Sequence, residues 1–96
     1  MSTTTDFIAE LIRAVNDIEK LTHYEVSRLL DRSIDTIRDM RRHTGDAGIH
    51  SVRDVLVDLR LSSERVQDLS AEQVRDALVD AADVLRSLKI VLDRTE

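Results

Sequence analysis

The residues that could do chemistry gather around the two glycines of the chain, Gly45 and Gly48. His43 and His50 flank this segment and Asp46 lies within it, so together they could in principle hold a metal ion. Their spacing matches no familiar metal site, and a glycine between Asp46 and His50 disfavours the helix that would bring those two side chains together. We therefore expect no metal here and interpret both histidines as solvated residues of a loop.

Other potential nucleophiles and acids lack the surroundings that catalysis needs. Ser62 and Ser63 have no flanking glycines of the kind that build a nucleophile elbow, and the chain contains no phosphate-cradling glycine loop. Without cysteine it has neither a thiol nucleophile nor a disulfide. Its many carboxylates alternate with arginines at helical spacing, which is typical of surface ion pairs. We expect no enzymatic activity and no cofactor.

Composition predicts one small helical domain spanning residues 1–96. Hydrophobic residues make up 42% of the 96, proline is absent, and aromatics are only 2%, so the core must be aliphatic. The lack of a signal peptide and of a long apolar run predicts a cytoplasmic protein outside the membrane. A net charge of −5 argues against a free-standing nucleic-acid binder, which would need a basic surface.

The longest helical pattern runs from Ser70 to Thr95. Ser70 and Gln73 form a capping-box signature, and the apolar residues after them recur at alternating four- and three-residue spacing. We expect the other elements to pack along the resulting seam, which consists of Val74, Leu78, Ala81, Leu85, Leu88 and Leu92.

Three further segments complete the predicted bundle. A first helix should run from residues 3–6 to near Leu21, and a second from the capping box of Thr22 and Glu25 to about residue 43. A third should begin at Ser51 and break at Leu61, before a short helical turn capped by Ser62 or Ser63. The predicted fold is all-α, a small bundle of three long helices plus one or two short ones.

Several apolar residues fall outside the predicted core faces, which often marks an interface. Val57 and Leu61 project away from the apolar face of the third helix, although Leu61 could instead close the hairpin against the last helix. The last helix carries a second apolar strip and, on its opposite side, an acidic ribbon that begins at Glu72. A homodimer that buries the second strip is one alternative. The candidate partner-binding residues are Val57, Leu61, Ala77, Val84, Ile90, Val91, Asp76, Asp80 and Asp83.

Residues 21–42 resemble the helix-turn-helix of MerR-type regulators and excisionase-like domains. The likeness is carried by Glu25-Val26, Arg28-Leu29-Leu30, Ser33 and Asp35-Thr36-Ile37-Arg38. It implies a DNA-binding regulator, with contacts made by Ser33, Thr36, Arg38, Arg41 and Arg42. Asp31 stands where those families place the glycine of the turn, and Asp39-Met40 stands where they place an aromatic pair. Both departures allow one continuous helix from His23 to about His43.

A second resemblance covers the first half of the chain. Residues 5–16 (Thr-Asp-Phe-Ile-Ala-Glu-Leu-Ile-Arg-Ala-Val-Asn), the Leu-Thr-x-x-Glu of residues 21–25 and residues 28–41 look like small helical proteins of rhizobial symbiosis islands. These are quorum-sensing antiactivators of the QseM kind, which are TraM-like in role. The resemblance implies a protein that sequesters a LuxR-type, acyl-homoserine-lactone-responsive activator and so blocks transcription of conjugative-transfer genes. We therefore expect action by protein–protein contact, with DNA binding as the alternative.

Overall fold

The computed structural model describes residues 3–44 and 52–95 and confirms the all-α prediction. Four α-helices and two short 3₁₀ helices account for nearly all of these residues, and no strand occurs among them. In chain order they are α1 (Thr3–Asn16), η1 (Ile18–Lys20), α2 (His23–Thr44), α3 (Val52–Glu64), η2 (Val66–Asp68) and α4 (Ala71–Thr95).

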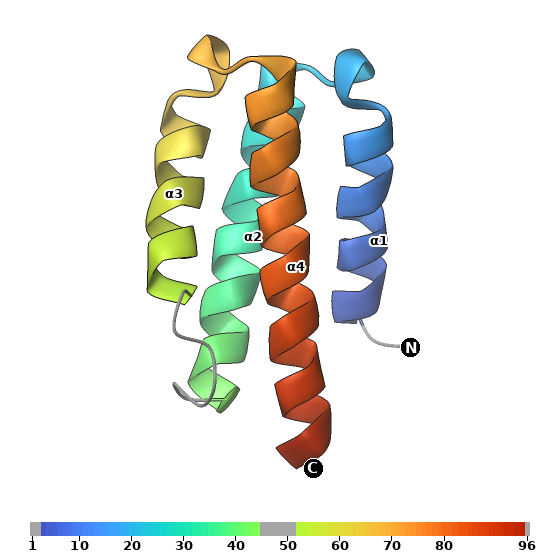
Figure 1. Cartoon of the computed structure of the whole chain (residues 1–96), viewed down its shortest axis with the longest axis vertical. Coiled ribbons are helices and arrows are strands. Elements are labelled where there is room, and N and C mark those ends of the chain that lie inside the picture. Colours follow the sequence, from blue (N-terminus) through green and yellow to red (C-terminus); the bar gives the residue numbers. More distant parts are fainter. Residues whose placement is uncertain (1–2, 45–51, 96) are drawn as a thin grey trace.

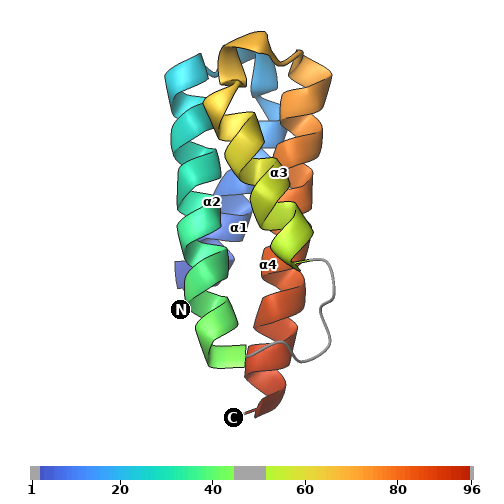
Figure 2. The same ribbon diagram turned by 90° about the vertical axis from the view of Figure 1, so that its left-hand side faces the viewer.

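The bundle has two central helices and two outer ones (Figure 1). The central pair, α2 and α4, pack against each other; α1 lies mainly on α4, whereas α3 lies on both α2 and α4. The short helices η1 and η2 lie at the same end of the bundle (Figures 1 and 2). The chain is thus built from two helical hairpins, α1–η1–α2 and α3–η2–α4.

The two hairpins are internal repeats related by a shift of 48 residues, which places Leu21 opposite Leu69. The backbone torsions agree closely: φ and ψ are −85° and 137° at Leu21, and −85° and 140° at Leu69. The residues before the 3₁₀ helices match as well, with −113° and 28° at Asp17 and −112° and 21° at Arg65. Both turns contain the same pattern, in which a buried aliphatic residue and a leucine precede Thr or Ser, then Glu or Gln, then Val.

Reciprocal capping boxes begin both central helices, as predicted. The Thr22 N–H donates to Glu25 Oε1 and the Glu25 N–H donates to Thr22 Oγ1, both at 3.1 Å. In the second repeat the Ser70 N–H donates to Gln73 Oε1 at 2.9 Å, and the Gln73 N–H donates to Ser70 Oγ at 3.1 Å. Each box satisfies two backbone donors that the first helical turn leaves without partners.

Replacing the capping hydroxyl should weaken the fold measurably. We expect Ser70→Ala to lower the free energy of unfolding by about 1 kcal/mol, because the Gln73 N–H then loses its acceptor. Urea unfolding followed by circular dichroism measures this change. Ser87→Ala, which alters an exposed serine within α4, serves as the control and should change stability by less than about 0.5 kcal/mol. Equal effects of the two substitutions would contradict the capping role.

The predicted seam of α4 forms the centre of the core. Its residues are buried except Leu92, which is half-buried. However, Ala77, Ala82 and Val84 are buried too, because α4 contacts each of the other three α-helices. The prediction that Ala77 and Val84 belong to an exposed partner-binding strip is therefore wrong, and these two residues are part of the core.

Two helices end at residues that differ from the predicted ones. The first helix ends at Asn16, and Ile18 then anchors η1 in the core, so the helix does not reach Leu21. The third helix continues through Ser62 and Ser63 to Glu64, so neither serine is a cap. The Ser63 hydroxyl instead donates to Asp31 Oδ1 of α2 at 2.7 Å and ties the two helices together. The predicted cap Ser51 and the glycine loop with Asp46 and His50 lie outside the described residues.

Residues 23–44 form one helix, so this segment does not contain the helix-turn-helix geometry that the resemblance implied. Asp31, at the position where a glycine would make the turn, lies in the middle of α2. The side chain of Ser33 is completely buried, and its hydroxyl donates to the Leu29 carbonyl at 2.8 Å. This local hydrogen bond lets a polar side chain occupy the core face of the helix.

Candidate protein-binding surfaces

A groove between α2 and α3 contains the most prominent apolar surface that the sequence predicted. Val57 and Leu61 lie one turn apart on α3 and remain 53% and 46% exposed. Figure 2 views the bundle from the side on which α2 and α3 lie in front. The groove has a volume of about 350 Å³. This α2–α3 groove is lined by Arg38, Arg41, Leu56, Val57, Arg60, Leu61 and Glu64.

The charge of the α2–α3 groove differs from that of the whole chain. It contains three arginines and one glutamate, on a protein whose net charge is −5. Among the described residues, no ion pair engages Arg38 or Arg60. A neighbouring, more polar cleft shares these two arginines and adds Asp31 and Asp35 of α2. Apolar surface and guanidinium groups therefore lie together in the groove, and the neighbouring cleft adds carboxylates.

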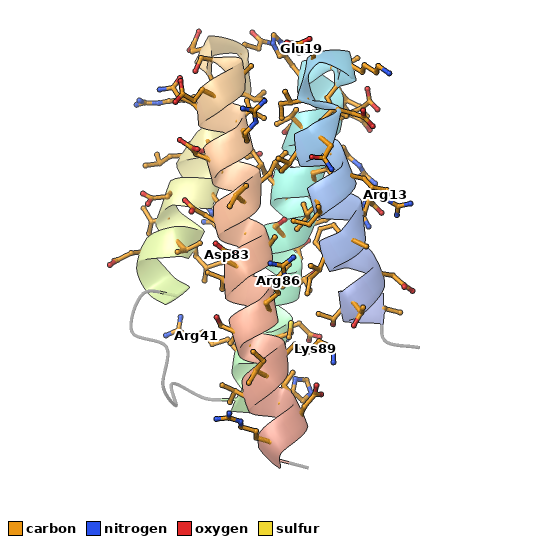
Figure 3. All side chains as sticks on the ribbon, turned by 45° about the vertical axis from the view of Figure 1, so that its right-hand side comes forward. Arg13, Glu19, Arg41, Asp83, Arg86 and Lys89 are labelled. Atoms are coloured by element: carbon orange, nitrogen blue, oxygen red, sulfur yellow. The ribbon has the colours of Figure 1, made fainter. Side chains whose placement is uncertain are left out.

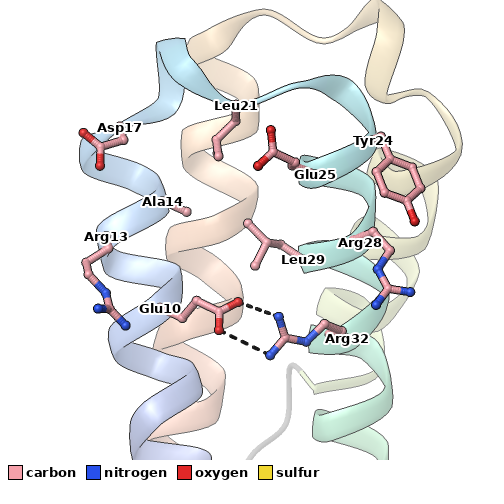
Figure 4. Close-up of a pocket in the computed structure, with 10 residues that line it drawn as sticks. All are labelled: Glu10, Arg13, Ala14, Asp17, Leu21, Tyr24, Glu25, Arg28, Leu29 and Arg32. Atoms are coloured by element: carbon pink, nitrogen blue, oxygen red, sulfur yellow. Dashed lines mark hydrogen bonds and ion pairs between the residues drawn. The ribbon is translucent and has the colours of Figure 1, made fainter.

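A second cleft, between α1 and α2, was not predicted (Figure 4). Its volume is about 420 Å³, and the ion pair between Arg32 and Glu10 spans it. Arg32 Nη2 also lies 3.4 Å from Glu10 Oε1, and the guanidinium carbon lies 4.5 Å from the centre of the Phe7 ring. Three arginines and three carboxylates line this cleft, so its formal charges balance.

The two repeats differ in how closely their helices approach. Leu29 and Arg32 of α2 correspond to the smaller Ala77 and Asp80 of α4, and each pair lines a cleft within its own hairpin. However, α3 packs on α4, whereas α1 packs mainly on α4 and little on α2. Only the spacing of the helices reveals such a cleft, and no local sequence motif signals it.

The predicted acidic ribbon is present on the exposed side of α4. Asp76, Asp80 and Asp83 are exposed, and Asp58 of α3 lies near them in a cleft between the two helices. Partial burial raises the pKa of Asp80 above its ordinary value, and the negative charges of Asp76, Asp83 and Asp58 raise it further. The ribbon is thus a site of like-charge repulsion within the folded chain.

Neutralising Asp80 should stabilise the protein at neutral pH. A carboxyl group whose folded pKa is raised destabilises the fold when it is ionised, and this cost disappears as pH falls through the folded pKa. We expect Asp80→Asn to increase the free energy of unfolding by about 0.5 kcal/mol at neutral pH. The gain should vanish near pH 3 and shrink in high salt. Urea unfolding at the two pH values tests this, and equal stability at neutral pH would contradict the repulsion.

The remaining predicted residues are scattered. Ile90 is 54% exposed on α4 but does not line the α2–α3 groove, and Val91 is half-buried. Figure 3 shows the second half of α4, where Arg86 and Lys89 project; Arg86 pairs with Asp83 at 4.0 Å and Lys89 pairs with Asp93 at 2.8 Å. The structure thus brings Val57 and Leu61 together in one groove and separates them from the acidic ribbon.

The residues proposed for DNA contact all lie on α2, but one of them is inaccessible. Ser33 is buried, so its predicted DNA contact is wrong, and the Thr36 hydroxyl donates to the Arg32 carbonyl at 2.7 Å. Arg38 and Arg41 line the α2–α3 groove, while Arg42 is exposed near the end of α2. These positions lie on one continuous helix, without the second helix that a helix-turn-helix places in a DNA groove.

Among the described residues, no group of three or more histidine, cysteine, aspartate or glutamate side chains could hold a metal ion. None of the helices in residues 3–44 and 52–95 combines the length and the apolarity needed to cross a bilayer. Comparison of the chain with protein-family models, curated proteins and solved structures gives no match.

Proposed function

We propose that this chain is a regulatory protein that binds a transcriptional activator and inhibits it by protein–protein contact. The observation that supports this most directly is the pair Val57 and Leu61, two large apolar side chains about half exposed beside a groove. Exposed apolar surface of this kind often marks a binding site on a small protein. The chain would act by occupying a surface of its partner and would perform no chemistry.

The nature of the activator is proposed from the resemblance of residues 5–41 to antiactivators of the QseM kind. On this proposal the protein acts in the cytoplasm on a LuxR-type activator that responds to an acyl-homoserine lactone, and it represses conjugative-transfer genes. The exposed ribbon of Asp76, Asp80 and Asp83 would add charge complementarity toward a basic surface of the activator.

A reporter assay tests the proposed function. The full chain is produced together with each LuxR-type activator encoded in its own genome, and transcription from that activator's promoter is measured. The proposal predicts that one activator loses most of its activity while its cellular level, measured by immunoblot, stays constant. Unchanged transcription with every activator would refute the proposal. Repression of the promoter in the absence of any activator would indicate direct DNA binding instead.

A further inference from the structure

The internal repeat provides a control for which surface residues the fold requires. Val57 and Leu61 of α3 correspond to Ala9 and Arg13 of α1, each 48 residues earlier in the chain. Ala9 and Arg13 are exposed, and the first repeat forms the same helix–turn–helix hairpin with them in place. The fold therefore does not need large apolar side chains at these two positions, and Val57 and Leu61 call for another explanation.

The comparison extends to the rest of the groove. Its basic residues on α2, Arg38 and Arg41, correspond to Arg86 and Lys89 on α4, which face the viewer in Figure 3. The outer helices differ, because Arg13 points away from α4 in that view and lines the α1–α2 cleft, whereas its counterpart Leu61 lines the α2–α3 groove. Basic residues on the central helix are thus common to both repeats, while exposed apolar residues beside them are specific to the second.

We infer that the α2–α3 groove binds an amphipathic helix that carries acidic residues beside its apolar ones. The inference rests on the proposed function, which would make this helix part of the activator. Val57 and Leu61 lie one turn apart along α3 and offer apolar contacts at the spacing of a docked helix. Arg38 and Arg60 have no ion-pair partner among the described residues, so both guanidinium groups can bind carboxylates of the incoming helix.

Charge decides between this occupant and others. A basic helix would place its cations against the guanidinium groups of Arg38 and Arg60, which have no ion-pair partner among the described residues. A second copy of the chain is a separate possibility, because the protein carries acidic helix faces of its own. These alternatives predict different results in the experiment below.

The probes are two designed helical peptides that share the same leucine anchors one turn apart. Glutamates flank the anchors in one peptide and lysines flank them in the other. Binding to the full chain is measured by fluorescence anisotropy, and the contacted residues are mapped by amide chemical shifts. We expect the glutamate peptide to bind at least ten times more tightly than the lysine peptide, with the largest shifts around Val57, Arg60 and Leu61.

The repeat supplies the variants. Val57→Ala combined with Leu61→Arg installs the residues of the first repeat, so the fold should be kept while the glutamate peptide binds at least tenfold more weakly. Asp68→Lys is the matched control, because it installs the counterpart Lys20 and adds positive charge at an exposed position outside the groove. It should leave binding unchanged. The double variant gains a positive charge, so tighter binding of the glutamate peptide would show that charge alone drives the contact and would overturn the inference.

Three other results would also overturn the inference about the groove. These are equal affinity for both peptides, no binding of either peptide at millimolar concentration, and chemical-shift changes confined to another face of the protein. Sedimentation of a dimer that the double variant dissociates would assign the groove to a second copy. The reporter assay separates the two proposals. If the glutamate peptide binds as expected but no activator is repressed, the proposed function fails; if the double variant still represses fully, the groove inference fails.

Discussion

Val84→Asp is expected to unfold the protein. Val84 is only 8% exposed and belongs to the same buried cluster as Leu85 and Leu88. An ionised carboxylate placed in this apolar cluster loses its hydration, which costs at least about 4 kcal/mol. A domain of this size has a total stability of about 5–15 kcal/mol, so the native population should fall sharply. Circular dichroism of the purified variant measures the loss of helix directly.

Val91→Asp is the matched control for this result. Val91 lies two turns further along α4 and is only half-buried, and its counterpart in the first repeat is the exposed His43. The aspartate can therefore reach solvent, and we expect a change of about 1 kcal/mol or less. Near-native helicity and stability of the Val84 variant would contradict the burial of that residue and would return it to the set of interface candidates.

The second large effect is expected from a pair of leucines at equivalent positions of the two repeats. Leu30 of α2 and Leu78 of α4 are both completely inaccessible, and α2 packs against α4 in the centre of the bundle. We expect Leu30→Ala and Leu78→Ala each to lower the free energy of unfolding by about 2–5 kcal/mol, because each leaves a cavity in a shared core.

Which hairpin becomes less stable after each substitution shows whether the two hairpins depend on each other. Each substitution should destabilise both hairpins equally, since neither can bury its apolar face alone. Amide hydrogen exchange, resolved by residue, measures the opening free energy in α2 and α4 separately. Faster exchange confined to the hairpin that carries the substitution would contradict a shared core and show that the two repeats unfold independently.

Local rules account for the parts of the fold that the sequence predicted well. The capping boxes at Thr22 and Ser70 depend on residues three apart, and the seam of α4 depends on spacing along one helix. The departures at Asp31 and at Asp39-Met40 allowed one continuous helix, and the structure contains that helix. In each case the interacting residues are close together in the sequence, so the local pattern is enough to predict the structural feature.

The sequence-based predictions fail where the exposure of a residue depends on which other helices surround its own helix. A helical pattern shows that Ala77 and Val84 lie together, but whether that strip is exposed depends on how many helices surround α4. The α1–α2 cleft similarly depends on how closely two helices approach. The internal repeat, in contrast, was visible in the sequence as Leu-Thr-x-x-Glu-Val at residues 21–26 and Leu-Ser-x-x-Gln-Val at residues 69–74. Comparison of these two segments would have predicted the paired hairpins.

The repeat also clarifies which part of the candidate site the sequence supports. Val57 and Leu61 were proposed because they project away from the apolar face of their helix, and both are exposed in the structure. The same reasoning failed for Ala77 and Val84, whose surroundings are set by tertiary packing. Exposed apolar residues that have small or charged counterparts in the other repeat are the better candidates for binding, since the fold tolerates their replacement.

The most direct test of a protein–protein function is affinity purification of the tagged full chain from the cells that produce it, at moderate salt. Bound proteins are identified by mass spectrometry and bound DNA is sequenced in parallel. We expect recovery of a transcriptional activator without a specific DNA site, and loss of that activator when Val57→Ala and Leu61→Arg are introduced together. Recovery of one DNA sequence with no protein partner would contradict it.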